Sequence, residues 1–478
     1  MTRRLLLLLS LSPAFFCARA SGPEERIRRV EDGLLQPVSI AGRPVEKFKL
    51  AERMQRHHVP GVSIAVIEHG AISWARGYGV FEAGGSRPVT PETLFQAASI
   101  SKPVAATAAL RLVEDDRLSL DQDVNKYLKS WHLPDNEFTK EEKATLRRLL
   151  SHSAGLTIHG FPGYEPGASL PSIPQILDGE KPANTAAVRV DTVPGTHYNY
   201  SGGGITIMQL LLCELTGKPF PELMRELVLD KIGMTHSTYQ QPLPPDRAAL
   251  AATAHDRLGV PMKGKWHVYP EMAAAGLWTT PSDLARFAIE LQRSRRGESN
   301  RILSKDMTNQ MLTRQIDDWG LGIGLKGTGE AARFEHGGDN AGFHSILMAS
   351  MDNGYGAVVM TNSDGGPALW SEILMSIAAE YGWPNYQPRV RTLAALSSEQ
   401  LEQYTGAYQS ASSPVKIRRV SEHLELTVGD FFVVEVYPES ETRFFAMDGE
   451  LPDLVFTKGA KGTIDSVAAG GLTARKIN

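Results

Sequence analysis

The sequence has little cysteine, no marked excess of either charge and no long apolar run. Only Cys17 and Cys213 occur among 478 residues, which excludes a disulfide-rich fold. Lys and Arg total 50 against 54 Asp and Glu, so the net charge of −4 gives no broad attraction to nucleic acid or anionic lipid. No stretch beyond the N-terminus approaches the roughly 20 apolar residues that cross a bilayer. We therefore expect no nucleic-acid partner and no stable membrane span.

Several common catalytic and binding motifs are also absent. The 13 histidines form no H-E-x-x-H pair and no Cys/His ligand cluster, so we expect no metal site. The chain has no G-x-S-x-G elbow, no P-loop, and no G-x-G-x-x-G before a helix. Gly202-Gly203-Gly204 is interpreted as a point of close packing and not as a phosphate cradle. The sequence thus predicts a protein that needs no cofactor.

The first 20 residues carry the three parts of a secretory signal. Arg3-Arg4 precede an apolar stretch over residues 5–16, and Ala18-Arg19-Ala20 fits an A-x-A cleavage site. We expect residues 1–20 to be a signal peptide cleaved after Ala20, which predicts a periplasmic or secreted protein. Lipoprotein processing at Cys17 is the alternative. Cys213 would then be the remaining thiol, and its apolar surroundings predict a small buried hydrophobic residue.

Two hairpins far apart in the sequence predict one antiparallel sheet. Apolar residues alternate over 62–78 around His69-Gly70, and a second pair of strands flanks Asn353-Gly354. Between the hairpins the pattern is mostly helical, with a helix start at Thr90-Pro91-Glu92. Further helices are predicted over 205–215, 221–228, 282–291 and 371–379. The expected fold class is therefore α/β (α+β), an antiparallel sheet flanked by helices plus a helical subdomain inserted between its two ends.

The C-terminal part differs in character from the rest. Pro384 and Pro388 interrupt the helical pattern, and the polar stretch over 386–400 predicts a linker between a main domain, 21–385, and a smaller C-terminal domain, 401–478. Residues 401–478 read as short, closely spaced strands, among them one over 431–436. They predict a small β-barrel or sandwich domain.

The chemistry of the sequence centres on Ser99-Ile100-Ser101-Lys102, placed before an apolar helix. Positions i and i+3 share a helix face, so the Lys102 amine can reach the Ser99 hydroxyl. The unpaired N–H groups and the positive dipole at a helix N-terminus favour the deprotonated forms of both groups. A serine nucleophile can form in this way without a histidine. A second S-x-x-K, beginning at Ser413, lies in the β-rich part with no helix after it, so we assign the chemistry to Ser99.

Taken in order, the motifs resemble the serine β-lactamase and penicillin-binding-protein superfamily. The similarity is greatest to the branch that holds class C β-lactamases, related carboxylesterases and D-amino-acid peptidases, and it spans residues 45–380. It includes Val59-Pro60-Gly61, Gly77-Tyr78-Gly79, Leu149-Leu150-Ser151-His152-Ser153-Ala154-Gly155-Leu156, Pro194-Gly195-Thr196, Gly276-Leu277-Trp278-Thr279-Thr280 and Thr361-Asn362. Tyr404-Thr405-Gly406-Ala407-Tyr408 resembles the small β-domain appended to many members of this branch. The resemblance implies a β-lactamase-like fold.

The resemblance also implies roles for three residues. Ser99 would be the nucleophile, and Lys102 and Tyr200 would manage its proton, with Tyr200-Ser201-Gly202 in the place of the family's Tyr-x-Asn. We expect the cationic Lys102 to lower the Tyr200 pKa from about 10, as a phenol acting as a base requires. Tyr198 is the competing candidate, since Tyr198-Asn199-Tyr200 also fits Tyr-x-Asn, but its register against Pro194-Gly195 differs by two residues.

His336-Gly337-Gly338, followed by Asp339, stands where the family has Lys-Thr-Gly on the sheet edge beside the nucleophile. The resemblance implies an oxyanion hole made by the N–H groups of Ser99 and Asp339, which contributes about 3 kcal/mol per donor. The alternative for His336 is a turn histidine without a catalytic task. His336 is a weaker, pH-dependent cation than lysine, and Gly202 lacks the amide that contacts the acylamino group of a β-lactam. Both departures favour the esterases and peptidases of the branch.

These observations predict an exported serine hydrolase that cleaves an ester or amide bond through an acyl-enzyme on Ser99, with carboxylester hydrolysis as the first choice. One alternative is a β-lactamase or a D-amino-acid peptidase such as a D-Ala carboxypeptidase. The other is a penicillin-recognising sensor or binding module without turnover. The expected partner is a small-molecule ester, peptide or β-lactam substrate. The sequence leaves the oligomeric state and the task of the β-domain open.

Overall fold

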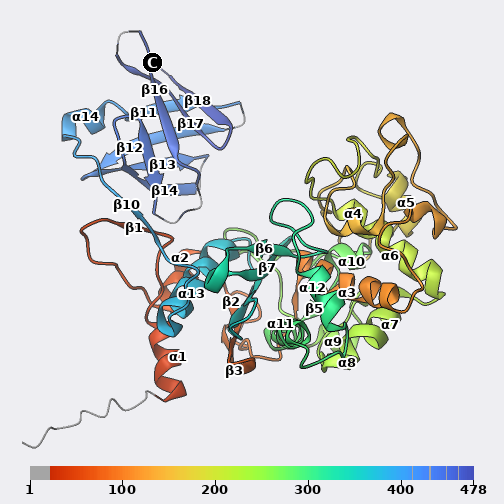
Figure 1. Ribbon diagram of the computed structural model, residues 1–478. Helices are drawn as coiled ribbons and strands as arrows, with labels where there is room; N and C mark the ends of the chain where they lie inside the picture. The colour runs from red at the N-terminus through yellow and green to blue at the C-terminus, as the bar shows by residue number, and fades with distance from the viewer. Residues whose placement is uncertain are drawn as a thin grey trace, which may run out of the picture.

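The computed structural model describes residues 22–411, 413–429, 432–447, 449, 451–460 and 462–477. The predicted signal peptide, 1–20, and the candidate lipoprotein site Cys17 lie outside these residues. Two parts follow one another along the chain, a larger one built around an open sheet and a C-terminal β-barrel that stands beside it (Figure 1).

The larger part is organised by a six-stranded sheet in the order β3-β2-β9-β8-β7-β6, in which every neighbouring pair is antiparallel. Its strands are β2 (Gly61–Glu68), β3 (Ala71–Gly79), β6 (Gly324–Lys326), β7 (Arg333–Asn340), β8 (Phe343–Ser350) and β9 (Gly356–Thr361). Both predicted hairpins are present. His69 and Gly70 turn between β2 and β3 with φ of 53° and 72°, and Gly354 turns between β8 and β9 with φ of 67°. Because β2 pairs with β9, the sheet joins the two ends of the domain as expected.

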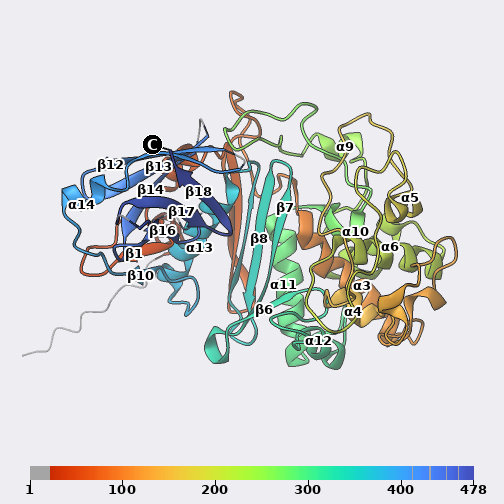
Figure 2. The ribbon, with the colours of Figure 1, turned by 90° about the horizontal axis from the view of Figure 1, so that it is seen from above.

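Helices cover both faces of this sheet because its central strands are apolar on both sides. Ile64 and Val66 face a core shared with α1 (Pro23–Glu31), α2 (Leu50–Arg56) and α13 (Gly366–Tyr381). Their neighbours Ala65 and Ile67 face the opposite core, which α11 (Pro281–Arg296) covers. Figure 2 shows the strands in the middle, with α13 and the barrel on one side and the helical part on the other.

The helical part is inserted between β3 and β6. Besides α11 it contains the short pair β4 (Phe95–Gln96) and β5 (Trp278–Thr279), and the helical elements η1 (Ala98–Ile100), α3 (Ser101–Glu114), η2 (Val124–Lys126), η3 (Glu137–Thr139), α4 (Leu146–Leu150), α5 (Ile173–Asp178), α6 (Gly202–Thr216), α7 (Phe220–Met224), η4 (Arg225–Leu229), α8 (Asp230–Ile232), α9 (Pro245–Ala248), α10 (Met272–Ala275) and α12 (Lys305–Met311). The short η5 (Gly329–Ala331) lies between β6 and β7. No helix in the described ranges is long and apolar enough to cross a membrane.

The insertion and α13 include the helices predicted over 205–215, 221–228, 282–291 and 371–379. The predicted helix start at Thr90-Pro91-Glu92 is wrong. The Thr93 hydroxyl accepts the Thr90 N–H at 2.8 Å and the Thr90 hydroxyl accepts the Glu92 N–H at 3.3 Å, so these side chains stabilise a turn that leads into β4. Cys213 on α6 is half-buried and not fully buried as expected, and burial raises the pKa of its thiol to about 11.

The C-terminal part is a closed eight-stranded antiparallel barrel, which decides between the barrel and the sandwich. Its strands are β11 (Gly406–Gln409), β12 (Pro414–Val420), β13 (His423–Val428), β14 (Phe432–Pro438), β15 (Arg443–Ala446), β16 (Leu454–Lys458), β17 (Ile464–Ala469) and β18 (Leu472–Lys476). The strand predicted over 431–436 corresponds to β14, apart from residue 431, which lies outside the described residues.

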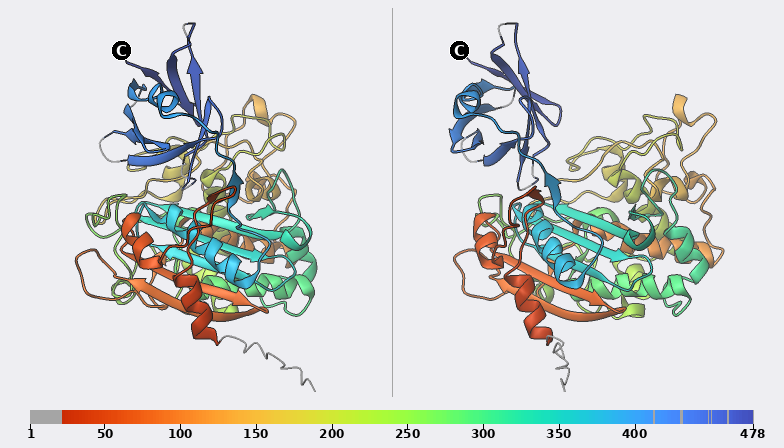
Figure 3. Two further views of the ribbon diagram at one scale, coloured as in Figure 1. Left: turned by 90° about the vertical axis from the view of Figure 1, so that its left-hand side faces the viewer. Right: turned by 60° about the vertical axis from the view of Figure 1, so that its left-hand side comes forward.

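The stretch predicted as a linker, 386–400, carries structure of its own. Its β10 (Arg389–Arg391) pairs in parallel with β1 (Val38–Ile40) near the N-terminus, and α14 (Ser398–Glu402) begins within it. Arg391 donates to Glu439 at 2.9 Å and to Asp453 at 2.5 Å, both on the barrel. The connection therefore ties the barrel to the first strand of the chain (Figure 3).

Candidate functional site

Ser99 and Lys102 meet at the start of α3, with Ser99 in the tight turn η1 that leads into this helix. The Lys102 Nζ donates to the Ser99 Oγ at 2.7 Å and to the backbone carbonyl of Ala274 at 2.8 Å. Lys102 is only 2% exposed. Burial disfavours the ammonium form of Lys102, whereas the carboxylate of Asp339 favours it. Burial has the larger effect, so the pKa of Lys102 is lowered to about 7. The S-x-x-K spacing therefore places an amine that titrates near neutral pH on the serine hydroxyl.

The second partner of Lys102 comes from α10, which is held in place by α6. The Gln209 side chain on α6 accepts the Ala273 N–H at 2.8 Å and donates to the Pro270 carbonyl at 3.0 Å. These two bonds fix both ends of the short segment whose Ala274 carbonyl faces Lys102. Sequence reasoning had no signal for this contact, because a backbone acceptor can belong to any residue type.

Of the two candidate tyrosines, the structure brings Tyr200 to Ser99. A hydrogen bond links the Tyr200 and Ser99 side chains, and the Lys102 Nζ lies 5.0 Å from the centre of the Tyr200 ring. Tyr198 instead packs its ring against Trp319, with centroids 5.5 Å apart. Tyr200 is positioned by α6, whose N-terminal Ser201 caps the Gly204 N–H at 3.1 Å.

The expectation that Lys102 lowers the Tyr200 pKa is wrong. Burial raises the pKa of Tyr200 well above 10, and the hydrogen bond with Ser99 offsets only part of this effect. The physical reason is that Lys102 lies in the same desolvated space, where its own charge is disfavoured. The phenol is consequently a proton donor at neutral pH, and the amine is the basic group of the pair.

His336 lies in strand β7 and not in a turn. Its ring centre is 6.3 Å from that of Tyr200, so it borders the same space as Ser99 and Lys102. Burial, together with the nearby charge of Lys102, lowers the pKa of His336 to about 3. The sequence predicted a weak cation at this position, but the buried imidazole is neutral at physiological pH.

The glycines after His336 let β7 approach the turn that carries Ser99 closely. Strand β6 pairs only with residues Arg333, Phe334 and Glu335 of β7, so β7 continues past it toward η1. A Cβ on Gly338 would lie 2.1 Å from the Ala97 carbonyl oxygen, whereas one on Gly337 would meet nothing closer than 4.0 Å. Gly338 is therefore needed for the contact between strand and turn.

Asp339, the next residue of β7, has an exposed side chain that is held by the half-buried His344. Its carboxylate pairs with His344 Nδ1 at 2.6 Å, and His344 Nε2 lies 3.2 Å from an oxygen of Asp364. Burial would lower the pKa of His344, but its hydrogen bonds to the two carboxylates raise it to about 9. The hydrogen bond from His344 also lowers the Asp339 pKa. Sequence reasoning missed both His344, which reaches Asp339 through the β7–β8 pairing, and Asp364, which follows strand β9 beside β8.

His152 and Trp319 complete an aromatic wall beside Tyr200 and were also missed as site residues. The ring centre of His152 lies 4.3 Å from that of Tyr200 and 5.1 Å from that of Trp319. His152 is buried, and its Nδ1 accepts the Ser201 N–H at 3.2 Å. Desolvation and the charge of Lys102 lower its pKa well below 6.5. The wall therefore adds a second neutral histidine to the surroundings of Lys102.

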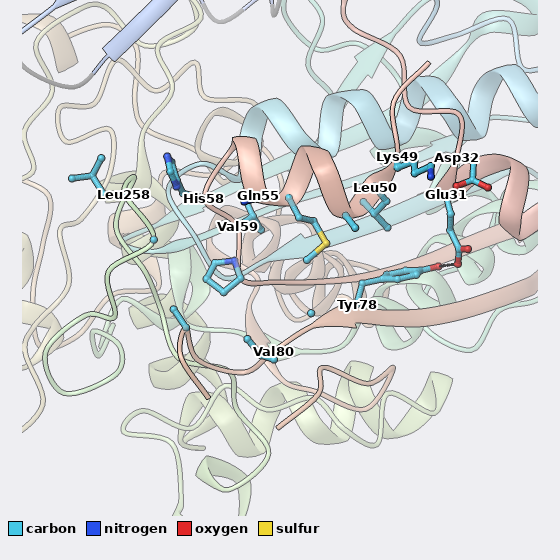
Figure 4. A pocket seen from close by; sticks show the side chains of 16 residues that line it. Glu31, Asp32, Lys49, Leu50, Gln55, His58, Val59, Tyr78, Val80 and Leu258 are labelled. Carbon is cyan, nitrogen blue, oxygen red and sulfur yellow. Dashed lines mark hydrogen bonds between the residues drawn. The ribbon is translucent and has the colours of Figure 1, made fainter. Parts of the chain in front are cut away.

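Two further observations concern possible metal and ligand sites in the described residues. The described residues contain no group of three or more His, Cys, Asp or Glu that could hold a metal ion. A surface groove of about 750 Å³ lies elsewhere, beside α2 and the end of β3 (Figure 4). Ser99, Lys102, Tyr200 and His336 are not among its lining residues.

Replacing Gly338 by alanine should destabilise the protein, whereas the same change at Gly337 should not. The new methyl group would collide with the Ala97 carbonyl, and because both partners are backbone the cost should be about 1–3 kcal/mol. Chemical denaturation of the Gly338→Ala and Gly337→Ala variants measures the two free energies of unfolding. Equal stability of the two variants would show that β7 and η1 do not depend on this contact.

Comparison with known proteins gives the chain a family. A family model described as Beta-lactamase matches residues 49–380. The chain is 25% identical over 339 residues to Penicillin-binding protein 4 of Amycolatopsis lactamdurans, covering 68% of this chain and 86% of that protein. It is 28% identical over 264 residues to a Beta-lactamase of Pseudomonas fluorescens, covering 55% of this chain and 63% of that protein. It spans 61% of Protein flp of Staphylococcus aureus (strain N315), at 24% identity over 65% of this chain.

Solved structures show the same fold at lower identity. The octameric penicillin-binding protein homologue from Pyrococcus abyssi has a TM-score of 0.62 at 20% identity, covering 89% of this chain and 98% of that chain. D-amino acid amidase from Ochrobactrum anthropi SV3 has a TM-score of 0.58 at 21% identity, covering 76% and 100%. These likenesses establish the expected fold, and the match over residues 49–380 shows that this chain belongs to the Beta-lactamase family of serine hydrolases.

Proposed function

We propose that this protein is an exported serine hydrolase that transfers an acyl group to Ser99 and then to water, with uncharged carboxylesters as its preferred substrates. The observation that carries the proposal is the 2.7 Å hydrogen bond between Lys102 Nζ and Ser99 Oγ, made by an amine whose pKa is lowered to about 7. The N-terminal signal pattern supports a periplasmic or secreted location.

The chemistry follows from the protonation states of the site. Neutral Lys102 accepts the Ser99 proton while Oγ attacks the ester carbonyl, and the N–H groups of Ser99 and Asp339 stabilise the oxyanion. Tyr200, whose phenol is protonated, donates to the departing alkoxide and regains a proton from Lys102. Water then repeats the attack on the acyl-enzyme, with Lys102 as the base. Each proton that leaves a nucleophile thus reaches a leaving group.

The preference for uncharged esters rests on the weak charge and tight space of the site. His336 stands where a lysine would face a substrate carboxylate, and with its pKa lowered to about 3 it offers no positive charge. A Cβ on Gly202 would lie 2.9 Å from the His159 carbonyl and 3.0 Å from the Phe161 ring, so this space cannot hold the amide of a Tyr-x-Asn motif. Both features support esters over β-lactams.

Cleavage of amides is the second candidate, because a curated relative 28% identical to this chain carries the name Beta-lactamase.

We expect p-nitrophenyl butyrate to be hydrolysed at least tenfold more efficiently, in kcat/KM, than nitrocefin or a D-Ala-D-Ala peptide. A fluorophosphonate should label wild type and fail to label Ser99→Ala, while Ser413→Ala, in the second S-x-x-K of the sequence, keeps both activities. Turnover of nitrocefin alone would replace the esterase by a β-lactamase, and absence of labelling in folded protein would favour a binding module.

The pH dependence should report Lys102. Because the base must be neutral, kcat/KM for p-nitrophenyl butyrate should rise tenfold per pH unit below an apparent pKa of about 7 and level off above it. His336, neutral above its pKa of about 3, should add no second step in this range. Stopped assays across the neutral range, on both sides of this pKa, test the profile, and a flat profile would remove Lys102 from the role of base.

Removal of the hydroxyl group should lower kcat strongly at Tyr200 and hardly at all at Tyr198. Tyr200→Phe takes away the proton donor to the leaving group, so kcat should fall about 10²–10⁴-fold. Tyr198→Phe keeps the ring that packs on Trp319 and should change kcat less than threefold. Steady-state kinetics on p-nitrophenyl butyrate measures both. The opposite order would transfer the role to Tyr198.

A further inference from the structure

The interior of the C-terminal barrel is filled unevenly. Near α14 the rings of Tyr404, Phe444 and Phe456 pack against one another, with centroids 4.9–5.1 Å apart. Leu401 of α14 is buried in the same cluster. Aromatic side chains thus fill this part of an eight-stranded barrel, whose interior is wide enough either for packed side chains or for one small ligand.

Another part of the barrel is lined mainly by small and aliphatic side chains in place of aromatic rings. These side chains leave a cavity of about 390 Å³. Its lining residues are Ser410, Ser413, Val415, Leu426, Val428, Leu451, Pro452, Leu454, Val467, Ala468, Ala469, Gly470, Leu472, Thr473 and Ala474. Five of them, Val415, Leu426, Leu454, Val467 and Ala474, are buried members of the barrel core. The cavity therefore reaches from solvent, where Pro452, Gly470, Leu472 and Thr473 of its lining are exposed, down to the apolar core of the barrel.

The chemistry of this lining is uniformly uncharged. The described residues that line the cavity include no Lys, Arg, His, Asp or Glu, and their polar side chains are the hydroxyls of Ser410, Ser413 and Thr473. Leu472, at the start of β18, is 66% exposed. An apolar volume of this size lies in the range of small-molecule sites.

We infer that the barrel is a second ligand site, which takes the alkyl chain of an uncharged single-chain amphiphile. The chain fills the aliphatic cavity, and the uncharged polar end remains at the hydroxyls of the rim. A fatty carboxylate fits less well, because none of the described lining residues is a cation that could pair with it. The cavity is lined only by residues from Ser410 onward, outside the matched family region 49–380, so the inference does not depend on the chemistry proposed for Ser99.

The test uses the full chain and 1-decanol, which has the required chain and head but no bond that a hydrolase could cleave. Displacement of the fluorescent probe N-phenyl-1-naphthylamine by 1-decanol gives the affinity. Ala474→Phe places a ring in the cavity and should weaken decanol binding at least tenfold. Val455→Phe adds a ring at a position 40% exposed on strand β16 of the same barrel and should change decanol binding less than twofold. Decanoate should bind wild type at least tenfold more weakly than decanol.

Two measurements keep the result interpretable. Circular dichroism and hydrolysis of p-nitrophenyl butyrate report whether Ala474→Phe folds, and Ala474→Leu, a smaller addition, replaces it if it does not. Equal decanol affinity in wild type and a folded cavity-filling variant would overturn the inference, as would the absence of binding to wild type. Loss of esterase activity in every variant, wild type included, would count against the Ser99 proposal and leave the barrel result standing.

Discussion

The burial of one amine is the constraint on which the rest of the site depends. Lys102 has almost no contact with solvent, and its Nζ is held between the Ser99 hydroxyl and the Ala274 carbonyl. An ammonium in this position exchanges its hydration for two hydrogen-bond acceptors, so its proton is weakly held near neutral pH. The protein can accept that cost because α6 and α10 fix the acceptor, and β7 closes over the turn that carries Ser99.

The charged and titratable groups around Lys102 also affect how strongly its amine holds a proton. The Asp339 carboxylate favours the ammonium form, but His344, itself held by Asp364, pairs closely with this carboxylate. Lys102 in turn disfavours the cationic forms of His152 and His336, which are already penalised by burial. The space next to Ser99 consequently holds one titrating base and two neutral imidazoles over the physiological range.

The sequence predicted the parts that depend on local pattern and missed those that depend on tertiary contacts. Both hairpins were predicted because their turns need the left-handed backbone that glycine adopts easily, and helix geometry alone brings Ser99 to Lys102. The turn at Thr90 was misjudged because side-chain hydroxyls can satisfy the same N–H groups that open a helix. His344 reaches Asp339 only through the pairing of β7 with β8. The pKa of Tyr200 was misjudged because desolvation depends on everything packed around a group, and no short motif contains it.

The functions proposed for the Ser99 site and for the barrel cavity share one chemical preference, although the two parts have unrelated folds. At the Ser99 site the proposed preference for uncharged groups follows from burial, which together with the neighbouring Lys102 keeps the histidine in place of lysine neutral. In the barrel it follows from a described lining without any ionisable side chain. An uncharged amphiphilic ester would satisfy both. Its carbonyl suits a site whose base is a desolvated amine, and its alkyl chain suits an aliphatic cavity that water fills poorly. The two proposals therefore agree on the polarity of the ligand, because both the Ser99 site and the barrel cavity suit an uncharged molecule.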